Sequence, residues 1–303
     1  MQSLLVTVNR AAGTADDDAV EAALTALRAG ADVTVAATAH EDELVEALAD
    51  RGERRLVVIG GDGSLHAAIN ALDRVGGLDP RQPVGLIPRG TGNDLAGALG
   101  LSLDPVAAAD AVLTGSPRLL DVLRDDDGGL VVNAVHAGVG ARASAEAERF
   151  KGRLGTAAFP LGAAVAGVTT PGLDLRVEVD GVVVTHEEGG WTADGSTGVL
   201  LIGVCNGPRI AGGTPLAPGA LPDDGLADVV VCTATGPVAR AAFAAALLGG
   251  SHPDRPDVWM GRGRRASFRG VPTEVSADGE VQEGVESRTW QVDHHAWSVL
   301  VPS

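Results

Sequence analysis

The stretch Leu56-Val57-Val58-Ile59-Gly60-Gly61-Asp62-Gly63-Ser64 joins an apolar run to a loop of three glycines around one aspartate. An amphipathic segment follows it, so the pattern predicts a buried β-strand, a tight loop and a helix over residues 64–72. Glycines let backbone N–H groups approach phosphate oxygens, and the N-terminus of a helix is electropositive. The stretch therefore indicates a phosphate-binding loop, although a tight turn capped by Ser64 would explain it as well.

The same alternation of short apolar runs and amphipathic segments extends on both sides of this loop. It is typical of an α/β domain with a mostly parallel sheet. We therefore predict such a domain over residues 1–123, with strands at residues 4–8, 33–37, 56–59 and 84–87 and helices at 17–28, 41–49, 64–72 and 93–99.

The remainder of the chain, residues 124–303, is rich in strand-like runs separated by Gly, Asp and Pro turns. This pattern predicts an antiparallel, β-rich domain built as a sandwich. The Asp125–Gly129 turn fits a boundary between the two domains, and the final strand is free to return toward the first one. The predicted strands are 131–134, 175–184, 199–204, 227–232, 266–269, 273–277 and 296–301, with helices at 143–149 and 238–248.

A second glycine loop follows the strand at residues 84–87, with the sequence Pro88-Arg89-Gly90-Thr91-Gly92-Asn93-Asp94. Ligands of open α/β sheets bind at the carboxyl ends of the strands, where Asn9 and Thr38 also follow predicted strands. Two such loops in one crevice suggest a nucleoside triphosphate. Helix capping by Asn93 or Asp94 is the plainer alternative.

The aspartate of the first loop carries a further implication. Asp62 would repel a phosphate unless a divalent cation lay between them, so we expect it to act on Mg²⁺ or on its bound waters. Neither loop is a Walker A motif, because that motif requires a lysine and the single lysine of the chain is Lys151.

Charge and composition exclude several classes of protein. The formal net charge of −17 over 303 residues disfavours a general nucleic-acid binder, which needs clustered Lys and Arg. No uncharged stretch forms a clean apolar span of about 20 residues, so any membrane contact should be peripheral. Cys205 and Cys232 lie far apart with no ligand-like spacing, which favours reduced thiols in a cytoplasmic protein and disfavours structural zinc.

Several motifs, taken in order, resemble those of the diacylglycerol kinase catalytic family, the bacterial-type lipid kinases of the NAD kinase/diacylglycerol kinase-like superfamily. The likeness covers nearly the whole chain. The motifs are Gly60–Ser64, Pro88–Ala96, Cys205–Pro208 with Gly212-Gly213, Ala217-Pro218, Pro222–Asp228 and Asp278-Gly279-Glu280.

The resemblance implies an ATP-binding first domain, a second domain that holds the lipid, and Mg²⁺-dependent phosphoryl transfer in the cleft. Asp62 and Asp94 would position the catalytic Mg²⁺, and Glu280 would be the general base. A structural metal would be held by the backbone carbonyls of Leu221 and Leu226 and by the carboxylate of Asp224. The loops and the resemblance together give as cofactor-binding candidates Asn9, Thr38, Gly60, Gly61, Asp62, Gly63, Ser64, Leu65, His66, Ala67, Gly90, Thr91, Asn93 and Asp94.

The residues alone leave other interpretations open. Asp278-Gly279 reads first as the tip of a two-residue hairpin, with Glu280 merely next to the turn. An NAD kinase would share the first domain. A non-catalytic nucleotide- or lipid-binding protein of the same fold is a third interpretation. Two departures from the family support it: Arg10 stands where the family usually has proline, and Gly97 stands where it often has arginine.

The expected partner is a lipid alcohol such as diacylglycerol, reached through peripheral contact with the inner face of the membrane. Two segments are candidates for that contact, Phe150–Phe159 and Arg262–Arg269. The sequence leaves a homodimer open.

Overall fold

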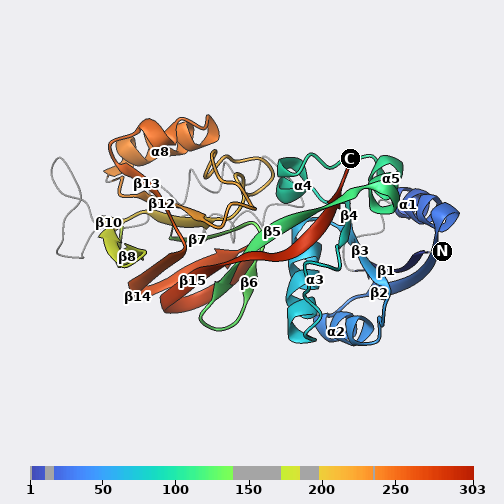
Figure 1. Cartoon of the computed structure of the whole chain (residues 1–303). Coiled ribbons are helices and arrows are strands. Elements are labelled where there is room, and N and C mark those ends of the chain that lie inside the picture. The colour runs from blue at the N-terminus through green and yellow to red at the C-terminus, as the bar shows by residue number, and fades with distance from the viewer. Residues whose placement is uncertain (1, 11–16, 139–171, 185–197, 235) are drawn as a thin grey trace. The chain divides into compact units, whose positions relative to one another are not determined.

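A computed structural model describes residues 2–10, 17–138, 172–184, 198–234 and 236–303 (Figure 1). The chain divides into two compact units. Unit 1 consists of the residues up to Val122 together with His294–Ser303, and unit 2 consists of Leu123–Asp293. Two long strands, β5 (Ser116–Asp125) and β15 (Glu280–Val301), therefore contribute residues to both units.

Unit 1 confirms the predicted α/β fold. Its four-stranded sheet has the order β2-β1-β3-β4, and every pairing in it is parallel. The elements are β1 (Gln2–Asn9), α1 (Asp17–Gly30), β2 (Ala31–Thr38), α2 (Glu41–Ala49), β3 (Arg55–Gly60), α3 (Asp62–Arg74), β4 (Gly85–Pro88), α4 (Asp94–Ala98) and α5 (Pro105–Thr114).

Alternate side chains along the strands bury one face of this sheet against α1 and α5. Leu4 and Val6 of β1 and Ile59 of β3 lie in one core with Leu24 of α1 and Val112 of α5. Helices α2 and α3 pack together beside β2 and β3 (Figure 1). Successive side chains of a strand point to opposite faces of the sheet, so apolar residues at alternate positions form the face that these helices bury.

The strand order places a topological switch point between β1 and β3. From β1 the chain crosses to β2 on one side, and then returns to β3 on the other side. In open α/β sheets, ligands bind beside the carboxyl ends of the strands at such a point. Here those ends are Asn9 of β1 and Gly60 of β3.

Unit 2 is antiparallel, as predicted. Strand β14 (Arg265–Ala277) is central to it, because its Val275–Ala277 part pairs with β7 (Ala134–Gly138) and its Ala266–Gly270 part pairs with β8 (Leu173–Val179). The register of β14 against β15 shifts between these two parts. The remaining elements are β6 (Leu130–Val131), β9 (Val182–Val184), β10 (Gly198–Val199), β11 (Leu201–Cys205), β12 (Ala227–Cys232), α8 (Gly236–Leu248), a 3₁₀ helix (His252–Asp254) and β13 (Val258–Gly263).

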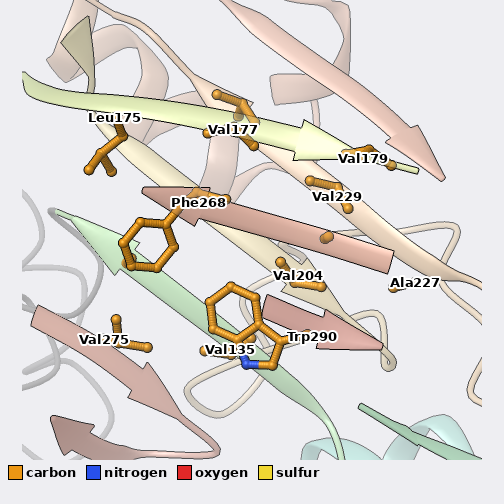
Figure 2. Close-up of a cluster of buried hydrophobic side chains, with 14 of the residues drawn as sticks. Val135, Leu175, Val177, Val179, Val204, Ala227, Val229, Phe268, Val275 and Trp290 are labelled. Carbon is orange, nitrogen blue, oxygen red and sulfur yellow. The ribbon is translucent and has the colours of Figure 1, made fainter. Parts of the chain in front are cut away.

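Side chains from β11 and β12 meet those from β8 and β14 in one apolar core (Figure 2). Val204 of β11 and Val229 of β12 lie in the same buried cluster as Val177 of β8 and Phe268 of β14. The rings of Phe268 and Trp290 lie 5.9 Å apart between centroids. This two-sided core is the β-rich fold that the alternating apolar pattern predicts.

Some predicted bounds differ from the structure. The sequence pattern does not predict α5, whose run of alanines gives no amphipathic contrast, nor β13. Strand β15 begins at Glu280 rather than at residue 296, because its first part alternates mostly polar, exposed side chains. The predicted helix at residues 143–149 lies outside the described residues. Among the described residues, no helix has the length and apolar character needed to cross a bilayer.

Candidate functional site

The two glycine loops of unit 1 touch each other. A Cβ added to Gly61 would lie 3.0 Å from the Cα of Gly90, and one added to Gly90 would lie 2.7 Å from the Cα of Gly61. The backbone N–H of Arg89 donates to the carbonyl of Gly60 at 2.8 Å. Only glycine permits this approach of two main chains, so the predicted convergence of the loops is explained by local sterics.

The carboxylate of Asp62 joins the two loops. It accepts hydrogen bonds from the backbone N–H groups of Asp94, at 3.0 Å, and Leu95, at 3.3 Å. These N–H groups open α4, so an aspartate from the first loop caps the helix that follows the second. The sequence predicts Asp62 as a nucleotide and Mg²⁺ residue, and this capping role is not predicted from it.

The predicted local caps are absent at these two helices. The capping positions are Gly61 for α3 and Asn93 for α4, and neither helix has a side-chain cap hydrogen bond at that position. Asn93 is left-handed, with φ of 53°, and its Nδ2 donates to the carbonyl of Gly90 at 2.7 Å. The interpretation of Ser64 or Asn93 as simple caps is therefore wrong, and Asn93 instead closes its own loop.

The other nucleotide-binding candidates occupy two places. Asn9 and Thr38 are register partners at the carboxyl ends of β1 and β2. Leu65 and His66 are buried on α3, where the Nδ2 of Asn70 lies 3.4 Å from the Nε2 of His66. The remaining candidates are the loop and first-turn residues Gly60, Gly61, Asp62, Gly63, Ser64, Ala67, Gly90, Thr91, Asn93 and Asp94.

Unit 2 holds the candidate base. Ala277 and Glu280 are register partners across a two-residue turn, and both turn residues are left-handed, with φ of 47° at Asp278 and 97° at Gly279. The predicted hairpin turn is thus present. Glu280 is exposed at the start of β15.

The turn is anchored by the side chain of Asp278, which the sequence predicts only as a turn residue. The Asp278 carboxylate accepts from the backbone N–H groups of Val132 at 2.7 Å, Asn133 at 3.0 Å and Ala134 at 2.9 Å. Because three main-chain N–H groups donate to one carboxylate, the turn that leads into Glu280 is held in a fixed position. No sequence signal reveals this bond set, because the donors lie far away in the chain.

Beside Asp278 lies a buried histidine that is not among the residues predicted from the sequence. His136 of β7 is the register partner of Ser276, and burial lowers the pKa of His136 to about 4, against a smaller raising effect of the Asp278 charge. The Nδ1 of His136 and the Oγ of Ser276 are buried without hydrogen-bond partners in the part of the chain that is described. This histidine is therefore neutral at pH 7.

The candidate structural metal site is already neutralised by an arginine. Asp224 accepts from the N–H of Leu226 at 3.1 Å, and its other oxygen pairs with the guanidinium of Arg262. The same guanidinium reaches Asp228 at 3.3 Å, where burial raises the pKa of that carboxyl and the charge of Arg262 opposes the rise. A carboxylate with backbone carbonyls suits a hard cation, but the cation would have to compete with Arg262.

Comparisons with known proteins agree with this arrangement. Residues 3–124 match the family model described as "Diacylglycerol kinase catalytic domain", and residues 133–301 match "YegS C-terminal NAD kinase beta sandwich-like domain". Two solved chains from Bacillus anthracis superpose with TM-scores of 0.78 and 0.72 over 99% of this chain and 97% and 96% of theirs, at 20% and 19% identity. At that identity the likeness concerns the fold alone.

Curated relatives carry the name "Probable lipid kinase YegS-like". The protein of Pseudomonas aeruginosa is 34% identical over 233 residues, which are 75% of this chain and 71% of the relative. That of Shewanella frigidimarina is 34% identical over 190 residues, 62% of this chain, so the match spans only 57% of that relative's length. With both units matched in order, the chain belongs to the diacylglycerol kinase catalytic family and carries the YegS-type C-terminal domain.

Proposed function

We propose that this protein is an ATP- and Mg²⁺-dependent lipid kinase, which transfers the γ-phosphoryl group of ATP to the hydroxyl of diacylglycerol or a related lipid alcohol. The observation that carries the proposal is the pair of glycine loops at the ends of β3 and β4, joined by Asp62. Bare main chain beside a helix N-terminus is suited to phosphate. The names of the curated relatives support a lipid acceptor.

The loop glycines and three acidic residues would have separate roles in this reaction. The main chain around Gly61 and Gly90 would cradle the phosphates, since neither glycine carries a side chain that would keep a phosphate away from the backbone. Bound Mg²⁺ would neutralise charge on the phosphate oxygens. Asp62 and Asp94 would hold its waters. Glu280 would accept the proton of the lipid hydroxyl as that oxygen attacks phosphorus.

Two further parts of the proposal concern the cation and the membrane. Asp224, with the carbonyls of Leu221 and Leu226, would bind a structural cation in place of Arg262. A diacylglycerol acceptor lies in a bilayer, so the enzyme would contact the membrane peripherally. Of the two candidate segments, Phe150–Phe159 lies outside the described residues, and in Arg262–Arg269 the first arginine is engaged by Asp224 and Asp228.

The test is transfer of labelled γ-phosphate from ATP and Mg²⁺ to a panel of diacylglycerol, monoacylglycerol, ceramide, sphingosine and NAD. We expect label in a lipid, and we expect Glu280→Gln to abolish it. Glu283→Gln is the matched control, because Glu283 is exposed on the same strand and has no assigned role. Label in NAD alone would replace the proposal with an NAD kinase. ATP binding without transfer to any acceptor would favour a non-catalytic protein.

A further inference from the structure

A cluster of metal-ligating side chains lies in unit 1, away from the glycine loops. It consists of Asp121 of β5 and the consecutive residues His294 and His295 of β15, two neighbouring strands (Figure 1). One potential ligand atom from each of the three residues lies within 4.8 Å of the other two. Among the described residues, no other group of three His, Cys, Asp or Glu side chains lies close enough together to share one ion.

The backbone at His295 is what brings the two imidazoles together. Consecutive side chains of a β-strand point to opposite faces, so His294 and His295 would normally diverge. His295 instead is left-handed, with φ of 52°, and the two rings stack with centroids 3.6 Å apart and planes 28° from parallel. A non-glycine residue in this conformation costs free energy, and such outliers are a reason to look for function.

Asp121 lies beneath the pair and is fully buried, while the side chain of His294 is half exposed. The Oδ1 of Asp121 lies 2.8 Å from the Nδ1 of His294, and it accepts a hydrogen bond from the backbone N–H of His295 at 2.7 Å. Its own carbonyl accepts the indole N–H of Trp297 at 3.2 Å. The carboxylate is therefore held in place by groups of β15, which pre-arranges one oxygen ligand beside two nitrogens.

The distances fit a transition-metal ion. Bonds of about 2.0 to 2.1 Å to nitrogen and oxygen place adjacent ligand atoms about 3.4 Å apart at tetrahedral angles, and about 2.9 Å apart at the right angles of an octahedral site. The Nδ1 of His294 and the Oδ1 of Asp121 have nearly this separation, and the imidazole nitrogens of His295 have no hydrogen-bond partner among the described residues. Two imidazoles with one carboxylate favour Zn²⁺, Ni²⁺ or Co²⁺ over Mg²⁺, which prefers oxygen ligands.

We propose that Asp121, His294 and His295 form a binding site for a divalent transition-metal ion, which cross-links β5 and β15. On binding, the ion would take the lone pair of the His294 Nδ1, whose imidazole then carries its single proton on Nε2, and an oxygen of the Asp121 carboxylate. Water would complete the coordination sphere. The proposal does not depend on the proposed kinase activity, and its test does not use that activity.

The experiment is calorimetric titration of tag-free, chelator-treated protein with Ni²⁺ and Zn²⁺, and with Mg²⁺ as the comparison ion. We expect one transition-metal ion per chain, with Ni²⁺ and Zn²⁺ bound far more tightly than Mg²⁺. His294→Ala and His295→Asn should each weaken binding at least tenfold. Asparagine tolerates the left-handed backbone, so His295→Asn removes the imidazole without forcing a change of fold.

A second readout is the thermal midpoint of the same proteins. An ion that binds only the folded state should raise the midpoint of the wild type and leave that of the two variants unchanged. His40→Ala is the matched control, since His40 is exposed in unit 1 away from the cluster. Equal binding by the wild type and a variant that carries both His294→Ala and His295→Asn would overturn the proposal, and so would a wild type that binds neither Ni²⁺ nor Zn²⁺ in the micromolar range.

Discussion

The carboxylate of Asp62 accepts a hydrogen bond from the backbone N–H of Asp94 at 3.0 Å, and so connects the loop after β3 to the helix that follows β4. One residue thereby serves two purposes. It fixes the relative position of two phosphate-type loops, and it places a negative charge where the proposed Mg²⁺ would be needed. Substitution at this position should therefore affect both stability and transfer.

Asp62→Asn should lower phosphoryl transfer about a hundredfold, because a pre-placed charge is lost. It should also cost about 1 to 2 kcal/mol of unfolding free energy, because an amide cannot accept equally well from both N–H groups. Steady-state kinetics and urea denaturation measure the two effects. Asp110→Asn, an exposed aspartate on α5, should change neither. A fully active Asp62→Asn enzyme would contradict the assigned role.

Gly90→Ala should separate the two loops. Its Cβ would lie 2.7 Å from the Cα of Gly61, a main-chain atom that cannot turn aside. We expect a loss of about 1 to 3 kcal/mol in stability, typical of overpacking, and weaker ATP binding. Gly97→Ala is the control, because a Cβ there meets nothing within 4 Å and alanine favours the helix α4 by up to about 1 kcal/mol. Unchanged ATP affinity in Gly90→Ala would argue against the loop pair as the nucleotide site.

His136 should make the protein less stable in mild acid. Its folded-state pKa, lowered to about 4 by burial, lies below the unfolded value of about 6.5, so the unfolded chain binds the proton first. Stability should fall as the pH drops from about 6.5 to 4, by about 3 kcal/mol from this group. His136→Leu should remove that part of the pH dependence in denaturant titrations, whereas His40→Ala should leave it intact. The lowered pKa of buried His252 acts in the same direction and would remain.

Arg262→Ala should make the candidate structural metal site more responsive to Mg²⁺. The guanidinium pairs with Asp224 and Asp228, and its removal leaves two carboxylates without their cation. We expect a stability loss of up to about 1 kcal/mol without Mg²⁺, since Arg262 is partly exposed. A larger rise of the thermal midpoint with added Mg²⁺ than in wild type should follow. Arg264→Ala, an exposed arginine on the same segment, should behave like wild type; equal Mg²⁺ responses in all three proteins would rule the competition out.

Two Asp-Gly pairs illustrate how far local sequence can predict this fold. Asp278-Gly279 predicts a two-residue hairpin turn, and the turn is there. Asp180-Gly181 forms the same kind of turn, with φ of 48° and 80°, yet the prediction runs a single strand through residues 175–184. The flanking residues are apolar on both sides of it, so the apolar pattern hides the turn that the dipeptide signals.

The site is partly predictable for a similar reason. Glycine loops after buried strands are local signals, so the convergence of Gly60–Ser64 with Gly90 follows from strand order and position. The bonds of Asp62 to α4, of Asp278 to the segment before β7 and of Asp121 to His294 each join residues distant in sequence. Such pairs depend on the tertiary packing of separate elements, which a single sequence does not display.

Strand β15 has a consequence for the order in which the protein folds as it is synthesised. Val84 donates to the carbonyl of Ser298 and accepts from the N–H of Leu300, and Leu300 is part of the core of unit 1. The N-terminal sheet is made first, but its last neighbour leaves the ribosome only after all of unit 2 has been translated. Until β15 has emerged, Val84 and the apolar core of unit 1 lack their contacts with this strand. We therefore expect the nascent N-terminal half to expose apolar surface during synthesis, which favours its association with chaperones.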